Sequence, residues 1–250
     1  MLDEEQDAQY SRDGEHGSLA VLYDCFINTA LKISPERGLA LDVACGAGQL
    51  LAKLARSMPD MQFLGTDISP HMLNLAAQNA QRFGAHNLRL QRHSMYELAS
   101  LGEARFDLVT YSLALHHCDN EQSAREVLNG IAHVLKPGGS VLIFDILRPK
   151  TGALALSFAD KFNRAEGSWY YQDSLDSYKA AFTFSELEDI LKTSALKNYR
   201  HVTPTVGNFF QFVYISSQSA RSTRRVSHLQ HLWQKRDYLM LQLGFLGKIK

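Results

Sequence analysis

The amino-acid sequence predicts an α/β fold, in which a mostly parallel, doubly wound sheet has helices on both faces. Two observations carry this prediction. Segments with the composition of buried strands alternate with segments of helical periodicity between residues 39 and 146. The first strand, within "LALDVACGAGQLLAKLA" (residues 39–55), passes through a turn with two glycines into a helix, as in the first unit of such a sheet. The 250 residues, 45% of them hydrophobic, suffice for one large core or two small ones.

The alternation defines the elements in order. Strands are expected at Leu39–Ala44, Gln62–Asp67, Leu88–Arg92, Phe106–Ser112 and Ser140–Ile146. Helices are expected between them at Gln49–Ser57, Pro70–Phe83 and Glu121–Leu135, and an amphipathic helix at Ser18–Ile33 precedes the first strand. "LKPGG" (135–139) should end the last of these helices and form a turn, because Pro137 and two glycines cannot continue a helix.

Beyond Pro149 the pattern changes to a helical, aromatic-rich stretch over residues 153–182. "TFSELEDILKTSAL" (183–196) has a helical period and an N-cap at Thr183 or Ser185. Two strands, Arg200–Val206 and Phe209–Ser216, flank Gly207-Asn208 and predict an antiparallel hairpin. This hairpin would complete a seven-stranded sheet with an antiparallel edge strand.

Composition limits the class of protein. Lys plus Arg and Asp plus Glu are each 26, and this balance disfavours a nucleic-acid-binding protein. The cysteines, Cys25, Cys45 and Cys118, are odd in number and lack zinc or redox spacing, which predicts reduced thiols, no metal site and a cytoplasmic location. The acidic first ten residues lack the apolar stretch of a signal peptide, and no apolar run approaches the roughly 18 residues of a membrane span.

The glycine turn restricts the ligand that the site can hold. Gly46 and Gly48 permit unusual backbone angles and a close approach of a ligand to the main chain. A phosphate-binding loop of the Walker type is excluded, because no Lys-Ser or Lys-Thr follows the glycines. A dinucleotide fingerprint is disfavoured, because Leu51 occupies its third small position and the acid Asp42 precedes the glycines.

A second acid, Asp67, ends the next strand at the spacing expected for a carboxylate that binds ribose hydroxyls. Its alternative role would be to cap the following helix. Ser69 can take that role, with Pro70 at the first helical position, which leaves Asp67 free for a ligand. The sequence therefore predicts a ligand with a ribose and no pyrophosphate.

The segments "LDVACGAGQL", "GTDIS", "FDLVTYSLALHH" and "LKPGGSVLIFDIL" occur in an order and spacing that resemble class I S-adenosylmethionine-dependent methyltransferases, and are most similar to the group that methylates small molecules and quinones. The resemblance covers roughly residues 39–147 and implies a Rossmann-like fold. It also implies cofactor contacts for Asp42, Ala44, Cys45, Gly46, Gly48, Asp67, Ile68, Ser112 and Leu113. The glycine turn would hold the amino-acid end of S-adenosylmethionine, Asp67 the ribose and Ile68 the adenine, while the end of the fourth strand, including Tyr111, would lie under the sulfonium.

One position departs from the family pattern. The family often has an acid after the third strand that accepts a hydrogen bond from the adenine amino group, and this sequence places Ser94 there. The serine oxygen, or the backbone of Met95, is then expected to contact the adenine.

Methyl transfer depends mainly on orientation and exclusion of water, and a general base is needed only when the acceptor arrives protonated. His116 and His117 are the candidate catalytic residues, with a purely structural role as the alternative. Asp145 and Arg148 are expected to form a salt bridge at the rim of the pocket. Cys118 has no partners for nucleophilic chemistry and is expected to be non-catalytic.

The resemblance also implies a domain organisation. Residues 1–38 would form an N-terminal helical cap, 39–217 the methyltransferase domain with a helical lid inserted at about 149–183, and 218–250 a basic segment with a helix at 226–243. Candidate acceptor-binding residues in the cap and lid are Tyr10, Tyr23, Arg148, Trp169 and Tyr170. The aromatic ones would enclose a flat or apolar acceptor, or simply pack a helix on the sheet.

Three functions remain open at this point. The first is transfer of a methyl group to an O, N or C atom of a small molecule. The second is methylation of RNA or protein, with the basic C-terminal segment as a docking surface. That segment can equally be a solvated helix face or a homodimer contact. The third is a non-catalytic subunit that binds S-adenosylmethionine for regulation or as a scaffold.

Overall fold

The computed structural model describes residues 18–156, 169–203 and 209–220. Its centre is a seven-stranded sheet with strand order β3-β2-β1-β4-β5-β7-β6. The strands are β1 (Gly38–Val43), β2 (Met61–Asp67), β3 (Leu88–Arg92), β4 (Phe106–Ser112), β5 (Leu135–Ile146), β6 (Arg200–Val202) and β7 (Phe210–Ile215). The chain order reverses between β1 and β4, which are neighbours, and in such sheets ligands bind in the crevice at this point.

Strand directions confirm the predicted fold class. β1 pairs in parallel with β2 and β4, β2 with β3, and β4 with β5. β7 is antiparallel to both β5 and β6. The antiparallel pairing therefore lies at one edge, as predicted, and the reversed strand β7 is one place inside the terminal strand β6.

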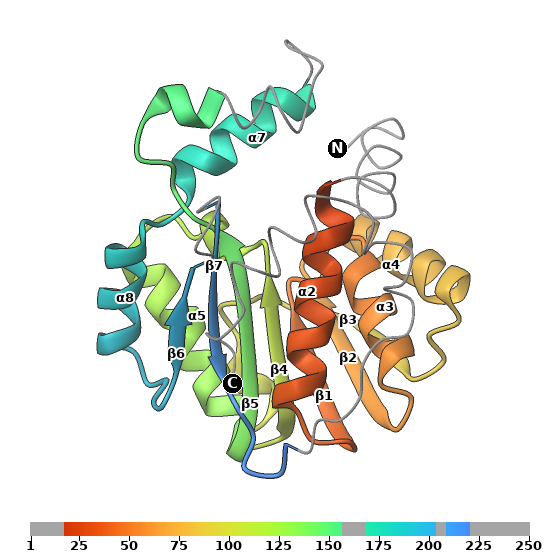
Figure 1. Cartoon of the computed structure of the whole chain (residues 1–250). Helices are drawn as coiled ribbons and strands as arrows, with labels where there is room; N and C mark the ends of the chain where they lie inside the picture. The colour runs from red at the N-terminus through yellow and green to blue at the C-terminus, as the bar shows by residue number, and fades with distance from the viewer. Residues whose placement is uncertain (1–17, 157–168, 204–208, 221–250) are drawn as a thin grey trace.

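Helices cover both faces of the sheet (Figure 1). They are α2 (Ser18–Ile33), α3 (Gln49–Ser57), α4 (Pro70–Phe83), α5 (Glu121–Val134), α7 (Trp169–Ala180) and α8 (Phe184–Thr193), with short 3₁₀ turns η1 (Leu98–Leu101) and η2 (Leu115–His117). Alternate residues of β1 point to opposite faces: Ala40 packs with α2 and α3, and Leu41 with α5 and α8. Two apolar cores, one on each face, thus hold the layers together.

Capping residues explain where several helices begin and end. Ser69 accepts a hydrogen bond from the Met72 amide, and Pro70 begins α4, which ends at Gly84 in a left-handed conformation. α8 begins with a capping box in which Thr183 and Glu186 bind each other's backbone N–H. Of the two predicted caps of α8, Thr183 is therefore the one used.

Strand β5 differs from its predicted bounds, since it begins at Leu135 and not at Ser140. The helix stop was correct, because α5 ends at Val134. Leu135 then pairs at once with Phe106 of β4, and an irregularity in register follows, with Gly138 at a φ of 75°. "LKPGG" is thus an irregular first part of the strand, because β4 offers it a backbone partner.

Helix α7 lies beyond the end of the sheet at which β5 finishes (Figure 1). The chain leaves β5 at Ile146 and returns from α7 to Phe182, whose carbonyl accepts a hydrogen bond from the Arg148 amide at 3.1 Å. The predicted Gly207-Asn208 turn, Tyr10 and the C-terminal helix lie outside the described residues. Of the helices in the described ranges, none has the length and apolarity that a membrane crossing requires.

Candidate functional site

The turn between β1 and α3 adopts an unusual backbone conformation. Ala44, Gly46 and Gly48 all have positive φ, at 52°, 53° and 67°. Cys45 lies between them, and its amide donates to the Thr66 carbonyl of β2 at 2.8 Å. Leu113, directly after β4, also has a φ of 52°. Non-glycine residues with positive φ are uncommon and cluster at functional sites. Ala44 and Leu113 are two such residues, and they directly follow the neighbouring strands β1 and β4.

The two glycines of the turn serve different purposes. A Cβ added at Gly46 would meet nothing within 4 Å, so this position opens onto free space. A Cβ added at Gly48 would lie 2.6 Å from the Cβ of Ala76 in α4. Gly46 therefore leaves space in which a ligand can approach the backbone, and the absence of a Cβ at Gly48 allows α4 to pack closely against the turn.

Leu51 explains how the helix packs without the third glycine of a dinucleotide site. Its side chain is buried, and a Cβ at Gly65 of β2 would come within 2.5 Å of Leu51 Cδ2. The bulk of Leu51 therefore requires a residue without a side chain on the neighbouring strand, which Gly65 supplies.

Asp67 holds the glycine turn in place. One carboxylate oxygen accepts from the Gly46 amide at 2.9 Å, and the other accepts from the Ser69 amide at 2.9 Å. Ser69 does cap α4, as predicted, but Asp67 is not free of backbone partners. Since each carboxylate oxygen has two lone pairs, both oxygens can still accept from a ligand.

Asn79 of α4 was missed by the sequence reasoning. It is buried, and its amide donates to the Ala47 carbonyl at 2.9 Å. This bond fixes the part of the turn between the two glycines. Nothing local in the sequence indicates it, because the partners are 32 positions apart.

Asp42 is buried beneath the turn and receives a hydrogen bond of 2.5 Å from the Thr110 hydroxyl of β4. Burial raises the pKa of Asp42 to about 7, against a lowering by the Thr110 bond. The side chain thus links β1 to β4 where the strand order reverses. A positively charged ligand nearby would favour its ionised form.

The loops after β2 and β3 form the adjoining part of the site. Ile68 is 63% exposed, unusual for a residue of its type, and its carbonyl accepts from Arg92 at 3.1 Å. The Ser94 hydroxyl accepts from the Tyr96 amide at 3.2 Å within its own loop. Met95 is half-buried, and its sulfur lies 3.3 Å from the Tyr111 hydroxyl.

Of the three residues predicted for the site at the end of β4, two are partly accessible and one is buried. Ser112 and Leu113 are half-buried, and the Leu113 amide donates to the Phe144 carbonyl at 2.7 Å. Tyr111, in contrast, is buried in the α5 face of the core and donates to the Ala114 carbonyl at 3.0 Å. Cys118 is buried 3.9 Å from the Tyr111 hydroxyl, and burial raises the pKa of its thiol to about 11.

The two candidate catalytic histidines have different surroundings. His116 is buried, and its Nδ1 lies 2.6 Å from the Asp145 carboxylate at the end of β5. His117 is exposed, with its ring centroid 4.2 Å from that of His116. Asp145 therefore pairs with a histidine and not with Arg148.

Arg148 joins the two ends of the segment that carries α7. Its side chain donates to the Ala181 carbonyl at 2.7 Å and to Glu186 at 2.9 Å. The expected salt bridge between Asp145 and Arg148 is thus wrong, because each residue has another partner. Glu186 was not anticipated, although its place in the capping box was the available signal.

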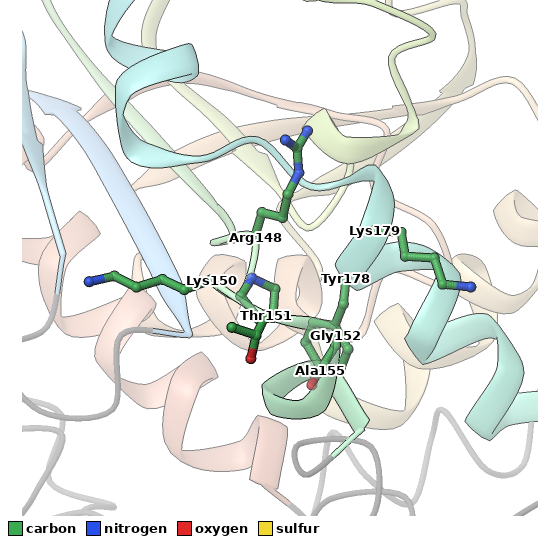
Figure 2. Close-up of a pocket in the computed structure, with 8 residues that line it drawn as sticks. Arg148, Lys150, Thr151, Gly152, Ala155, Tyr178 and Lys179 are labelled. Carbon is green, nitrogen blue, oxygen red and sulfur yellow. The ribbon is translucent and has the colours of Figure 1, made fainter.

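A shallow pocket of about 350 Å³ lies beside this junction and is lined by Arg148, Pro149, Lys150, Thr151, Gly152, Ala155, Tyr178 and Lys179. Figure 2 shows that the cationic ends of Arg148, Lys150 and Lys179 point away from one another. No residue of the glycine turn contributes to this pocket.

The remaining predicted acceptor-binding residues are only partly located. Tyr23 of α2 is half-buried against α3, with Lys53 Nζ 5.6 Å from its ring centroid. Trp169 and Tyr170 are in the first turn of α7, but their side chains, like Tyr10, lie outside the described part. Asp173 of α7, which the sequence reasoning missed, interacts electrostatically with both histidines.

The arrangement fits S-adenosylmethionine. Free space opens over Gly46, a carboxylate lies beside it on Asp67, and an exposed apolar side chain follows at Ile68. These features match the needs of an amino-acid end, a ribose and an adenine. Within the described ranges, no group of three His, Cys, Asp or Glu side chains is arranged to hold a metal ion.

Comparisons with known proteins identify related methyltransferases. Residues 40–139 match a family described as a methyltransferase domain. The uncharacterized methyltransferase Rv0089 of Mycobacterium tuberculosis is 30% identical over 155 residues, which are 59% of this chain and 72% of that protein. The demethylmenaquinone methyltransferase of Thermus thermophilus is 28% identical over 138 residues, 55% of this chain and 60% of that protein.

Among solved structures, the plantazolicin methyltransferase BamL, in complex with a triazolic desmethylPZN analog and SAH, shares the fold with a TM-score of 0.60. It is 17% identical, and the superposition covers 98% of this chain and 84% of that one. This chain spans 58% and 51% of the length of two further relatives, both uncharacterized methyltransferases.

Proposed function

Because the chain belongs to the class I S-adenosylmethionine-dependent methyltransferases, we propose that it transfers the methyl group of S-adenosylmethionine to an O, N or C atom of a small-molecule acceptor. The observation that carries the proposal is the position of Gly46. It opens onto free space at the reversal of strand order, and its amide is held by Asp67. When bound there, the cofactor supplies an activated methyl group, and the protein supplies orientation and a dry site.

Each part of the cofactor has a proposed partner. The backbone of Ala44, Cys45 and Gly46 binds the amino-acid end, with Gly48 and Asn79 fixing the shape of the turn. Asp67 binds the ribose hydroxyls. Asp42 lies buried beneath the turn, where a positively charged group of the bound cofactor would favour its ionised form. Ile68, Ser94 and Met95 contact the adenine, and Ser112 and Leu113 lie beside the sulfonium.

The small-molecule class is supported by two relatives. Demethylmenaquinone methyltransferase and an ubiquinone biosynthesis O-methyltransferase, 28% and 29% identical to this chain, are named for quinone compounds. A helical segment with buried Tyr171 and Tyr178 lies over the end of β5 and suits an acceptor of limited size. The alternative hypothesis, methylation of RNA or protein, rested on the basic C-terminal segment, most of which lies outside the described residues.

Calorimetric titration of the full chain with S-adenosylhomocysteine tests the cofactor site. Asp67→Ala should weaken binding ten-fold or more, because hydrogen bonds to a charged group contribute about 1.5–3 kcal/mol. Glu103→Ala, which removes an exposed carboxylate before β4, is the matched control and should bind like the wild type. Unchanged affinity in Asp67→Ala would sink the ribose assignment.

The acceptor is tested by incubation of the wild type with methyl-labelled S-adenosylmethionine and a cell extract. We expect the label in the small-molecule fraction, identified by mass spectrometry. Label confined to RNA or protein would overturn the proposed acceptor class. Tight cofactor binding without any transfer would instead support a regulatory or scaffold subunit.

A further inference from the structure

The 3₁₀ turn η2 holds two histidines at the end of the sheet where the cofactor site lies. The side chain of His116 is 6% exposed and that of Asp145 is 2% exposed. Three N–H groups converge on Asp145: His116 Nδ1 at 2.6 Å, the His116 amide at 3.0 Å and the Ile146 amide at 2.6 Å. The carboxylate only accepts, so Nδ1 of His116 carries a proton and its ring is fixed in one orientation.

His117 occupies the exposed side of this pair. Its ring lies against that of His116, with the ring planes 41° apart. The charged groups that act on it come from every neighbouring element: His116 from η2, Asp145 from β5, Asp173 from α7 and Asp67 from β2. Both Asp67, the proposed ribose carboxylate, and Asp173 of α7 therefore act electrostatically on His117.

The pKa values of the two histidines are shifted in opposite directions. Burial would lower the pKa of His116, but the ion pair with Asp145 outweighs it, and the pKa is raised above its ordinary 6.5. Partial loss of hydration and the charge of His116 lower the pKa of His117. His116 therefore holds its second proton to a higher pH than His117 does, and near neutral pH His117 is mostly a neutral imidazole that can take a proton.

We propose that His117 is the general base of methyl transfer, that His116 and Asp145 are its positioning residues, and that the acceptor is a phenol or enol hydroxyl. This inference rests on the proposed function and specifies its acceptor atom. A hydroxyl must lose its proton as it reacts, whereas a neutral amine reacts through its lone pair and can release its proton to water afterwards.

The proposed step balances. The acceptor oxygen forms a bond to the methyl carbon, the carbon–sulfur bond breaks, and its electron pair remains on sulfur. The acceptor proton passes to a ring nitrogen of His117. The step requires no oxidant or reductant, and His117 returns its proton to solvent because it is exposed.

Titration of the ring resonances by NMR tests the histidine assignment without an acceptor. The full chain is labelled with ¹³C-histidine, and His116→Gln and His117→Gln identify the two signals. We expect His117 to titrate below 6.5 and His116 above it. In Asp145→Asn, the pKa of His116 should fall, because the ion pair that raises it is lost. A His117 pKa at or above that of His116 in the wild type overturns the proposal.

The second test measures the rate of methyl transfer. Its acceptor is the small-molecule fraction that the wild type labels in the cell-extract experiment. His117→Gln should lower kcat at pH 7 by 10²-fold or more, the typical contribution of a general base, and leave S-adenosylhomocysteine affinity unchanged. His86→Gln, an exposed histidine before β3, is the matched control and should keep the wild-type rate.

The outcomes separate this inference from the proposed function. Failure of the wild type to bind S-adenosylhomocysteine contradicts the proposed function. Normal binding with a wild-type rate in His117→Gln across pH 6–9, or a product methylated on nitrogen or carbon, contradicts only the role of His117. Retained turnover in Asp145→Asn with a shifted pH profile supports a positioning role for Asp145.

Discussion

The two halves of the site are held together by different kinds of contact. At the ends of β1 and β2, the glycine turn is fixed by contacts to backbone atoms: Asp67 accepts from Gly46, and Asn79 donates to Ala47. At the end of β5, side chains pair with one another: His116 with Asp145, and Arg148 with Glu186. The first half depends on the backbone conformation of the turn, which the glycine motif in the sequence indicates. The second half depends on pairs of side chains that come together only in the folded protein.

Substitution of the glycines tests this contrast most strongly. In Gly48→Ala the free energy of unfolding should fall by about 2–5 kcal/mol, because a left-handed alanine costs about 1–2 kcal/mol and crowding against Ala76 about 1–3 kcal/mol. Gly46→Ala meets no neighbouring atom, so only the conformational cost of about 1–2 kcal/mol applies. Urea denaturation measures both variants.

Cofactor binding should be weakened more in Gly46→Ala than in Gly48→Ala, which is the reverse of the order expected for stability. The added methyl group of Gly46→Ala enters the free space beside Asp67 and should weaken S-adenosylhomocysteine binding ten-fold or more, although the protein is folded. If Gly46→Ala bound the ligand like the wild type, the free space over this residue would not be the cofactor site.

Asp42 provides a test within the first half that depends on pH. Its folded pKa, about 7, lies above its ordinary value of 3.8, so the folded state binds more protons than the unfolded state between these values. Stability from this group is therefore present at low pH and lost as pH rises towards 7. The side-chain amide of the Asp42→Asn variant cannot ionise. From pH 5 to pH 8, the free energy of unfolding of Asp42→Asn should therefore rise relative to that of the wild type by at most about 3 kcal/mol.

Denaturation of wild type and Asp42→Asn at both pH values measures this difference, and the other titrating groups cancel because they are shared. Glu103→Gln, which removes an exposed carboxylate, controls for the loss of a charge. A constant difference between wild type and Asp42→Asn would mean that burial does not perturb this carboxyl group.

The contrast also explains what the sequence could predict. The bounds of α2, α3 and α4 and the unusual backbone angles of the glycine turn follow from local patterns such as caps, periodicity and glycine spacing. The separate roles of Gly46 and Gly48 do not, because Ala76 reaches Gly48 only when α4 packs on α3. Asp145 and Arg148 lie close together in the sequence, yet their partners lie 29 and 38 positions away. Sequence proximity suggested a pair that the fold does not form.

Arg148 gives the smallest expected effect and tests the second half. Arg148→Met keeps much of the side-chain stem but loses the bonds to Ala181 and Glu186. Because both members of the ion pair are about one-third exposed, we expect a loss of only about 1 kcal/mol. Hydrogen exchange should show this as roughly five-fold faster exchange of the Arg148 amide, which bonds to Phe182 where the segment ends.

Lys179→Met is the matched control, since its pair with Asp176 is exposed on both sides and its loss should leave exchange unchanged. S-adenosylhomocysteine affinity should be unchanged in both variants, because Arg148 acts on the junction of the segment and not on the glycine turn. Normal exchange in Arg148→Met combined with a raised KM for the labelled acceptor would restore Arg148 to the acceptor-binding role that the sequence first predicted. The guanidinium would then have to leave Glu186 when the acceptor binds.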